Sequence, residues 1–242
     1  MQSTRPTVVL VHDGCSDAGS WFGVIAELHW RGLTVLAVAN PLRGLAHDAA
    51  YLADVLAGIE GPVVLVGHSY GGAVITEAGS APNVVALVYV AAYLPDVGES
   101  YCALAGRFAP SQLIPRLRRT EFANGRPAEL TVPAECFGPL LAADLDAELA
   151  LVLAASQRPA AERVLTDTQA FAAWRSKPSW ALVTGADRAL PPAIQRFTAE
   201  RAGAAVLELP EVSHSVAVSR PTAVAELIHD AAESCPAPGL LV

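Results

Sequence analysis

Residues 62–72 read PVVLVGHSYGG, and this stretch decides how the rest of the chain is interpreted. It begins as a short apolar run rich in β-branched residues, which is typical of a buried strand. It continues as GHSYG at residues 67–71, a G-x-S-x-G motif, and residues 73–78 then follow a helical pattern. A strand, a sharp turn that carries a serine, and a helix form the context in which this motif places a reactive serine.

The turn around Ser69 requires small neighbours. A serine in so tight a turn has unfavourable backbone angles, and Gly67 and Gly71 leave room for them. The hydroxyl then stands clear of the sheet, and the helix that begins at Tyr70 points its first N–H groups toward the same space. We therefore expect Ser69 to act as a nucleophile.

Composition excludes several other classes of function. The chain has 242 residues, 52% of them apolar, and a formal net charge of −8, which argues against a nucleic-acid partner. No apolar stretch reaches membrane-spanning length, and the first residues lack the features of a signal peptide. The four cysteines form neither a zinc pattern nor a disulfide framework. We expect a cytoplasmic protein, and the single lysine among many arginines favours a bacterial source.

Apolar runs alternate with helical patterns along most of the chain. Strands are predicted at residues 7–11, 33–39, 62–66, 84–93, 180–184 and 205–209. Helices are predicted at residues 20–31, 45–59, 191–202 and 222–234. Strands that are apolar throughout and alternate with helices indicate a parallel sheet with helices on both faces. We predict an α/β fold with a doubly wound, mainly parallel six-stranded sheet, and we place Ser69 at the ligand-binding edge of that sheet.

The alternation stops between residues 96 and 176. Proline and glycine interrupt this segment, no buried strand is evident, and helical pieces are predicted at residues 111–118 and 140–157. We interpret the segment as an inserted helical cap over the strand ends. Residues 1–95 and 177–242 then form the core. Residues 236–239, which read PAPG, are expected to be a loose tail.

A serine hydroxyl needs a base within hydrogen-bond reach, and histidine is the usual one. His214 lies on a loop just after the last predicted strand, so it can lean over Ser69. The other histidines that lie outside motifs, at positions 29, 47 and 229, fall in predicted helices. We therefore predict that His214 is the base.

The imidazole needs a carboxylate that fixes its tautomer and stabilises its charged form. Asp187 follows the strand before the one that leads to His214, which fits the chain order of serine, acid and histidine. The rival is Asp96, at the end of the fourth strand.

A developing oxyanion needs two N–H donors. Tyr70 should supply one, and the loop after the first strand should supply the other, from either Gly14 or Cys15. His12 in that loop is predicted to be structural. His68 is predicted to pack beside the sheet rather than act on a substrate.

Four motifs together resemble the α/β-hydrolase superfamily: VLVH (9–12), GHSYGG (67–72), GADR (185–188) and SHS (213–215). The compact chain with one short cap is similar to the plant methyl-esterase and hydroxynitrile-lyase branch and to its bacterial relatives. This resemblance implies a triad of Ser69, His214 and Asp187, with oxyanion donors from Gly14 and Tyr70.

Asp13 departs from the family pattern, because the esterases keep glycine at this position and the lyases keep threonine. Aspartate tolerates left-handed backbone angles, but its charge would repel an oxyanion if it pointed into the pocket. Either Asp13 points away and holds the loop, or the pocket does something other than simple ester hydrolysis. The lyases also have a lysine just after the catalytic histidine. This chain has Ser215 there, which argues against cyanohydrin cleavage.

We therefore expect a serine hydrolase that cleaves a small, largely apolar carboxylic ester or lactone through an acyl-enzyme, with no metal or organic cofactor. Candidate substrate contacts are Asp13, Cys15, Phe108, Phe137 and Trp174. One alternative is a cofactor-free lyase, cyclase or dehydratase of secondary metabolism, in which His214 and Asp13 supply acid–base chemistry. Another is a ligand-binding protein without catalysis.

Overall fold

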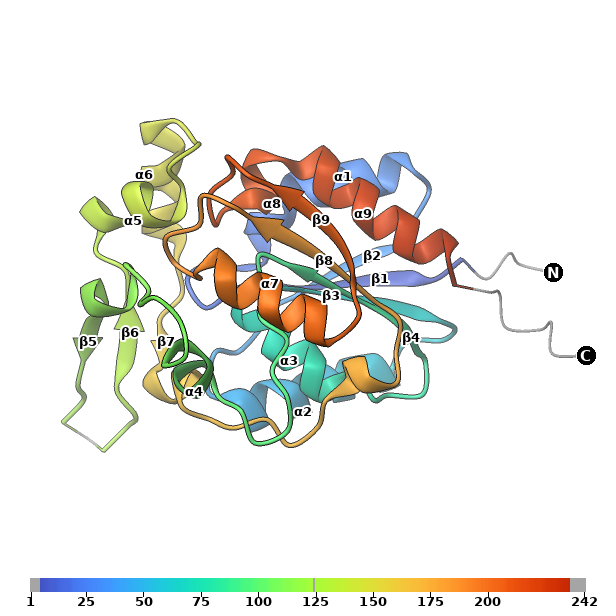
Figure 1. Cartoon of the computed structure of the whole chain (residues 1–242), viewed down its shortest axis with the longest axis horizontal. Helices are drawn as coiled ribbons and strands as arrows, with labels where there is room; N and C mark the ends of the chain where they lie inside the picture. Colours follow the sequence, from blue (N-terminus) through green and yellow to red (C-terminus); the bar gives the residue numbers. More distant parts are fainter. Residues whose placement is uncertain (1–4, 124, 236–242) are drawn as a thin grey trace, which may run out of the picture.

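Six parallel strands form the central sheet of the computed structural model, which describes residues 5–123 and 125–235 (Figure 1). The strand order is β2-β1-β3-β4-β8-β9. The strands are β1 (Thr7–Val11), β2 (Val35–Val38), β3 (Val63–His68), β4 (Val84–Val90), β8 (Ser179–Thr184) and β9 (Ala205–Leu209). The predicted doubly wound parallel sheet is confirmed, although β2 and β4 are shorter than expected. The predicted tail at residues 236–239 lies outside the described residues.

Side chains that alternate along the buried strands build two apolar cores, one on each face of the sheet. In β1, Val9 and Val11 pack into one core, whereas Val8 and Leu10 pack into the other. All four side chains are at most 1% exposed. Burial of each such side chain contributes about 1.5–3 kcal/mol, so a strand with two apolar faces is stable only when helices cover both.

Helices cover both faces of the sheet (Figure 1). One layer comprises α2 (Leu45–Ala57), α3 (Tyr70–Ala78) and α7 (Pro192–Arg201). The other comprises α1 (Phe22–Trp30) and α9 (Pro221–Glu233), with the short α8 (Val216–Ser219) beside them. Helix α8 was not predicted, because four residues are too few to show a helical period. No described helix is both long enough and apolar enough to cross a membrane.

The segment 96–176 lies between β4 and β8, and we call it the cap segment. Its helices are α4 (Tyr101–Ala105), α5 (Ala134–Leu141) and α6 (Ala147–Ser156). It also contains a three-stranded antiparallel sheet made of β5 (Arg118–Thr120), β6 (Glu129–Thr131) and β7 (Ala160–Ala161). The cap segment is therefore mixed rather than purely helical.

Both helical pieces predicted in the cap segment need correction. Residues 111–118 form only a 3-10 turn, Ile114–Arg116, and the chain then becomes extended to pair with β6. Residues 140–157 are divided between α5 and α6. Asp146 begins the second helix, because its side chain accepts a hydrogen bond from the Leu149 N–H at 2.8 Å.

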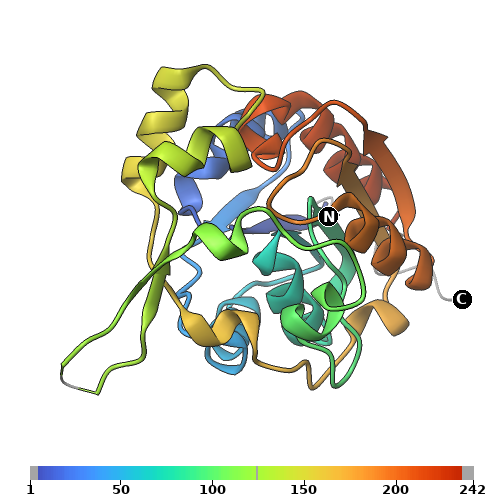
Figure 2. The same cartoon turned by 60° about the vertical axis from the view of Figure 1, so that its left-hand side comes forward.

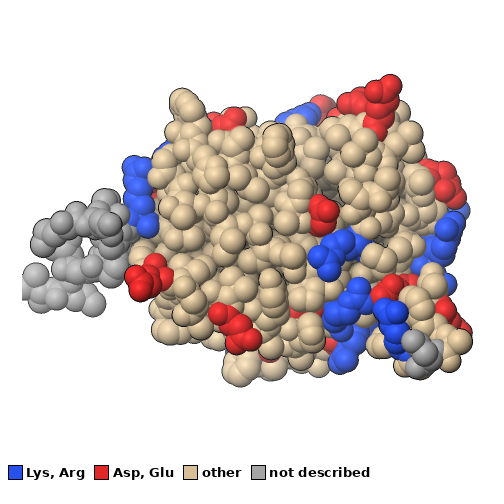
Figure 3. All heavy atoms as spheres, turned by 180° about the vertical axis from the view of Figure 1, so that it is seen from behind, with Lys and Arg blue, Asp and Glu red and all other residues tan. Residues whose placement is uncertain are grey.

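The β5–β6 hairpin projects away from the central sheet (Figure 2). Seen from behind, charged side chains of both signs gather around its tip (Figure 3). On β5, Arg119 forms ion pairs with Glu121 and Glu162. At the inner end of the same hairpin, Leu117 and Leu130 face a cavity. The hairpin is thus polar at its outer end and apolar where it meets the core.

We predict that Gly67→Ala destabilises the fold by about 2 kcal/mol or more. A Cβ atom at position 67 would lie 2.4 Å from the backbone oxygen of Gly71, which cannot move without shifting the start of α3. Denaturant unfolding measures the change. Gly138→Ala is the matched control, because its added Cβ would make an ordinary 3.5 Å contact with Ala150 inside the helical layer of the cap. Equal stability of the two variants would contradict the argument.

Candidate active site

Ser69 occupies a strained turn between β3 and α3. Its φ is +52° and its ψ is −116°, a conformation that L-residues rarely adopt. The turn is possible because a Cβ atom at Gly71 would lie 2.5 Å from the carbonyl oxygen of Val11, so only glycine fits there. The Ser69 N–H donates a hydrogen bond to the Val90 carbonyl at 3.1 Å, which ties the turn to β4.

His214 and Asp187 form a hydrogen bond at the carboxyl edge of the sheet. The Nδ1–H of His214 donates to Oδ2 of Asp187 at 2.7 Å, and the two residues are 3% and 6% exposed. The rival Asp96 is not a partner of this histidine. It instead pairs with Arg175 at 2.8 Å.

The Asp187 carboxylate is held by four donors besides His214. Its Oδ2 accepts hydrogen bonds from the Thr184 hydroxyl and the Gln195 amide, each at 2.9 Å. Its Oδ1 accepts from the backbone N–H groups of residues 189 and 190, at 2.9 and 2.8 Å. A buried carboxylate with five donors is fully satisfied, so it can fix the orientation of the imidazole. Sequence reasoning missed Thr184 and Gln195.

The loop that carries His214 is held from two sides. The Ser213 hydroxyl and the Ser215 N–H both donate to the carbonyl of Leu141, at 3.0 and 2.8 Å, which joins the loop to the end of α5. On the other side, Nε2–H of His68 donates to the carbonyl of His214 at 3.0 Å. The cap segment and β3 together therefore position the imidazole.

The pKa of His214 is raised although its ring is buried. Burial alone would lower this pKa, because it disfavours the charged imidazolium. The negative charge and hydrogen bond of Asp187 outweigh burial, and the charge of Asp13 adds to them. The imidazolium is therefore the form that the surroundings stabilise, as a proton-accepting base requires.

The loop after β1 lies against the start of α3. An added Cβ atom at Gly14 would lie 3.8 Å from the Cβ atom of Tyr70. The N–H of Cys15 is already used, since it donates to Oδ1 of Asp13 at 2.7 Å. Among the described residues, the N–H groups of Gly14 and Tyr70 have no acceptor. Of the two predicted donors in this loop, Gly14 thus has the free N–H group.

The Tyr70 side chain is anchored by a residue that sequence reasoning missed. Its hydroxyl donates to Oδ2 of Asp48 at 2.8 Å, and Asp48 is fully buried. The signal was present in the sequence, because Asp48 falls on the apolar face of the predicted helix 45–59, beside Leu45 and Leu52.

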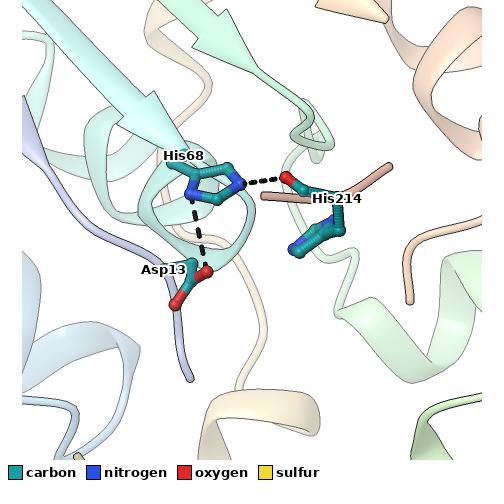
Figure 4. A group of neighbouring side chains, drawn as sticks. All are labelled: Asp13, His68 and His214. Atoms are coloured by element: carbon teal, nitrogen blue, oxygen red, sulfur yellow. Dashed lines mark hydrogen bonds and ion pairs between the residues drawn. The ribbon is translucent and has the colours of Figure 1, made fainter. Parts of the chain in front are cut away.

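Asp13 points toward His68 and holds its own loop (Figure 4). Oδ2 of Asp13 lies 3.5 Å from Nδ1 of His68, and Asp13 is 5% exposed. The centroids of the His68 and His214 rings are 4.9 Å apart. His68 therefore packs beside the sheet, as predicted, but it also contacts both Asp13 and the backbone of His214. His12, as predicted, bonds within its loop, through Nδ1 to the Asp13 carbonyl at 2.8 Å.

Burial and mutual interaction shift the pKa values of this pair. Burial lowers the pKa of His68 to about 4. Burial raises the pKa of Asp13, but the positive charge that the rings of His68 and His214 carry when protonated, together with the N–H of Cys15, outweighs it and lowers the pKa.

Ser69 and His214 line one cavity with about 650 Å³ of empty space, part of which is open to solvent. Asp13, Gly14, Cys15 and Tyr70 also line it. The remaining lining residues are apolar or aromatic, and most belong to the cap segment: Tyr93, Tyr101, Leu113, Ile114, Leu117, Leu130, Ala160, Val164, Leu165, Ala189 and Leu190.

Three predicted substrate contacts do not line this cavity. Phe108 packs against Phe197, with ring centroids 5.4 Å apart. Phe137 is buried among cap residues, and Trp174 donates through Nε1 to the carbonyl of Pro95 at 2.9 Å. These three aromatic side chains thus serve packing, whereas Tyr101 and smaller aliphatic residues of the cap segment line the cavity.

A family model described as the alpha/beta hydrolase family matches residues 8–227, which is most of the chain. This chain belongs to the alpha/beta hydrolase family. The resemblance inferred from the sequence motifs is therefore confirmed, as is the fold. This hydrolase is also 42% identical over 69 residues to a carbendazim hydrolyzing esterase of Nocardioides sp.. That match spans 26% of this chain and 28% of the relative.

Solved structures share the fold of this hydrolase at low sequence identity. Polyneuridine aldehyde esterase is similar with a TM-score of 0.80 and 21% identity, over 93% of this chain and 98% of that one. A methylesterase from Arabidopsis gives a TM-score of 0.78 and 20% identity, over 94% and 99% of the two chains. A pyrethroid hydrolase from Sphingobium faniae gives a TM-score of 0.76 and 21% identity, over 95% of this chain and 98% of that one.

We predict that Asp13→Asn lowers the pKa of His214. The substitution removes one of the two negative charges that raise this pKa but leaves the Asp187 hydrogen bond in place. Titration of the imidazole by NMR measures the change, and it needs no substrate. Asp96→Asn is the control, because Asp96 pairs with Arg175 and does not contribute to the pKa of His214. A His214 titration that is identical in wild type and Asp13→Asn would contradict the prediction.

Proposed function

We propose that this protein is a serine hydrolase that cleaves a small, largely apolar carboxylic ester or lactone through an acyl-enzyme. Ser69 would be the nucleophile, His214 the base and Asp187 the residue that orients it. The observation that carries the proposal is that His214, which is hydrogen-bonded to Asp187, lines the same cavity as Ser69 in its strained turn. Membership of the alpha/beta hydrolase family supports it.

Acylation uses the two free N–H groups of the site. Ser69 Oγ attacks the carbonyl carbon while Nε2 of His214 accepts its proton. The carbonyl electrons move onto oxygen, and the N–H groups of Gly14 and Tyr70 stabilise the resulting oxyanion. When the tetrahedral intermediate collapses, the C–O bond to the alcohol breaks. His214 then returns the proton to the leaving alcohol.

Deacylation repeats these steps with water as the nucleophile. His214 takes a proton from water, the hydroxide oxygen attacks the acyl carbon, and the same N–H groups bind the second oxyanion. The bond to Ser69 Oγ breaks, Ser69 regains its proton, and the acid leaves. Asp13 points toward His68 and holds its own loop, so its charge is directed away from the oxyanion.

The cavity lining supports an apolar substrate. Leucine, isoleucine, valine, alanine and tyrosine make up its walls, and Asp13 and His214 are its ionisable groups apart from Tyr and Cys side chains. An apolar wall favours apolar acyl or alcohol groups, since water is released when they bind. The relative and the structural neighbours are named as an esterase of carbendazim, an esterase of polyneuridine aldehyde and a pyrethroid hydrolase.

We predict that Ser69→Ala lowers the turnover of short p-nitrophenyl esters by at least about 10³-fold, because no nucleophile remains. A fluorophosphonate probe followed by mass spectrometry should label Ser69 in the wild type and label nothing in the variant. Ser80→Ala is the matched control, since Ser80 is exposed in the turn that follows α3. Retained turnover in Ser69→Ala would remove this serine from the mechanism.

We further predict that Asp187→Asn lowers kcat by about 10⁴-fold, because an amide cannot fix the correct tautomer or stabilise the imidazolium. Asp96→Asn should change kcat by no more than a few-fold, since this carboxylate pairs with Arg175. Steady-state kinetics of both variants, with thermal unfolding as the check on folding, compare the two candidate acids. A large loss in Asp96→Asn alone would reverse the assignment.

A further inference from the structure

Asp13, His68 and His214 form a buried cluster that the proposed reaction does not fully use. One carboxylate oxygen and one nitrogen from each ring lie within 4.8 Å of one another, and all three residues are at most 5% exposed. They come from three separate elements, which are the loop after β1, the end of β3 and the loop after β9 (Figure 4). Burial of this many polar groups is costly unless each has a partner.

The hydrogen bonds of the two rings determine which nitrogens are free. Nε2 of His68 faces a backbone carbonyl, which can only accept, so Nε2 carries the proton and Nδ1 is a lone pair. That Nδ1 is buried and has no hydrogen-bond partner. Nδ1 of His214 donates to Asp187, so the nitrogen of this ring that is left to bind a cation is Nε2.

The cluster thus presents three possible electron-pair donors. Oδ2 of Asp13 lies 3.5 Å from Nδ1 of His68, and this buried nitrogen has no hydrogen-bond partner. A carboxylate oxygen and an imidazole nitrogen at this distance can both coordinate one cation. We propose that the cluster binds a Zn²⁺-class divalent ion through Asp13 Oδ2, His68 Nδ1 and His214 Nε2.

The donor set and its surroundings suit zinc. Two imidazoles and one carboxylate with a fourth position open are a known zinc arrangement, whereas Mg²⁺ and Ca²⁺ prefer oxygen ligands. Zinc bonds of about 2.0–2.2 Å in a tetrahedron place neighbouring ligand atoms roughly 3.4 Å apart. The Asp13–His68 contact already has this spacing, at 3.5 Å.

The outer contacts of both histidines also match a metal site. Histidines that bind metals almost always donate their other ring nitrogen to a carboxylate or a backbone carbonyl. His214 donates to the Asp187 carboxylate at 2.7 Å, and His68 donates to the His214 carbonyl at 3.0 Å. Asp13 and His214 also line the cavity, so a fourth ligand such as water can enter from that side.

The ion would act as an inhibitor rather than a cofactor. Nε2 of His214 accepts the Ser69 proton in the proposed reaction, and the same lone pair would bind the metal. Metal and proton transfer therefore exclude each other. This regulatory consequence rests on the proposed function, whereas the metal site itself does not.

The binding test uses Ser69→Ala, which keeps all three ligands but turns over no substrate. Titration of the metal-free protein with Zn²⁺ by calorimetry should give one site per chain. Co²⁺ as a spectroscopic probe should give visible absorption typical of low coordination. Asp13→Asn and His68→Gln, each added to Ser69→Ala, should weaken Zn²⁺ binding by more than about 100-fold, because loss of an outer partner alone costs roughly 10–100-fold.

His229→Gln in the same background is the matched control. It removes a histidine outside the cluster, which lies 3.8 Å from Glu233, and should leave Zn²⁺ affinity unchanged. Circular dichroism reports folding, and if His68→Gln does not fold, the nearly isosteric Asp13→Asn carries the test. No binding to Ser69→Ala, or a Zn²⁺ affinity that Asp13→Asn leaves unchanged in that background, would overturn the proposed site.

The functional arm uses the wild-type protein. Zn²⁺ should inhibit ester turnover at the concentration at which it binds Ser69→Ala, and a chelator should restore the rate. If Zn²⁺ binds but the protein hydrolyses no ester, the metal site stands and the proposed function fails. If Zn²⁺ binds through Asp13 and His68 without slowing turnover, His214 is not a ligand and the three-residue site is wrong.

Discussion

The close approach of two glycines to neighbouring backbone is the constraint on which the site depends. Gly71 packs against the carbonyl of Val11, and Gly67 packs against the carbonyl of Gly71, at distances that leave no room for a Cβ atom. These approaches bring the loop after β1 against the first turn of α3. The strained backbone of Ser69, the free N–H groups of Gly14 and Tyr70, and the contact of Asp13 with His68 all follow from that juxtaposition.

The opposite half of the site is built differently, because hydrogen bonds rather than close packing hold it. Asp187 accepts five of them, from side chains and from its own loop, so it has little freedom to turn. His214 has one nitrogen bound to Asp187 and its backbone carbonyl bound to His68. A rigid turn thus faces an imidazole that is oriented by a polar network.

Local patterns in the chain were enough to predict the sheet, the elbow at Ser69 and the pairing of His214 with an acid. Buried parallel strands are continuous apolar runs, and the carboxyl ends of such strands converge whatever the details of packing. The role of Gly67 and Gly71 could be inferred because a turn this tight requires small residues beside the serine. Asp187 followed from chain order, and its bond to His214 agrees with that order.

The cap segment could not be predicted in the same way. Arg118–Thr120 is exposed and polar, and it is a strand only because Glu129–Thr131 pairs with it across the hairpin. The cavity walls likewise depend on which cap side chains turn inward. Size and apolar character alone therefore did not show that Phe137 and Trp174 lie outside the lining. The contact between Asp13 and His68 joins residues that are far apart in sequence, and no pattern within either segment indicates it.

The carbonyl of Leu141 links the cap segment to the loop that carries His214. It accepts hydrogen bonds from both neighbours of His214, yet it belongs to α5 in the segment that walls the cavity. Exchange of the cap for that of a relative would therefore disturb the position of His214 as well as the cavity wall. A redesign that changes the cavity but keeps His214 in place should retain the end of α5 and alter the aliphatic residues beyond it.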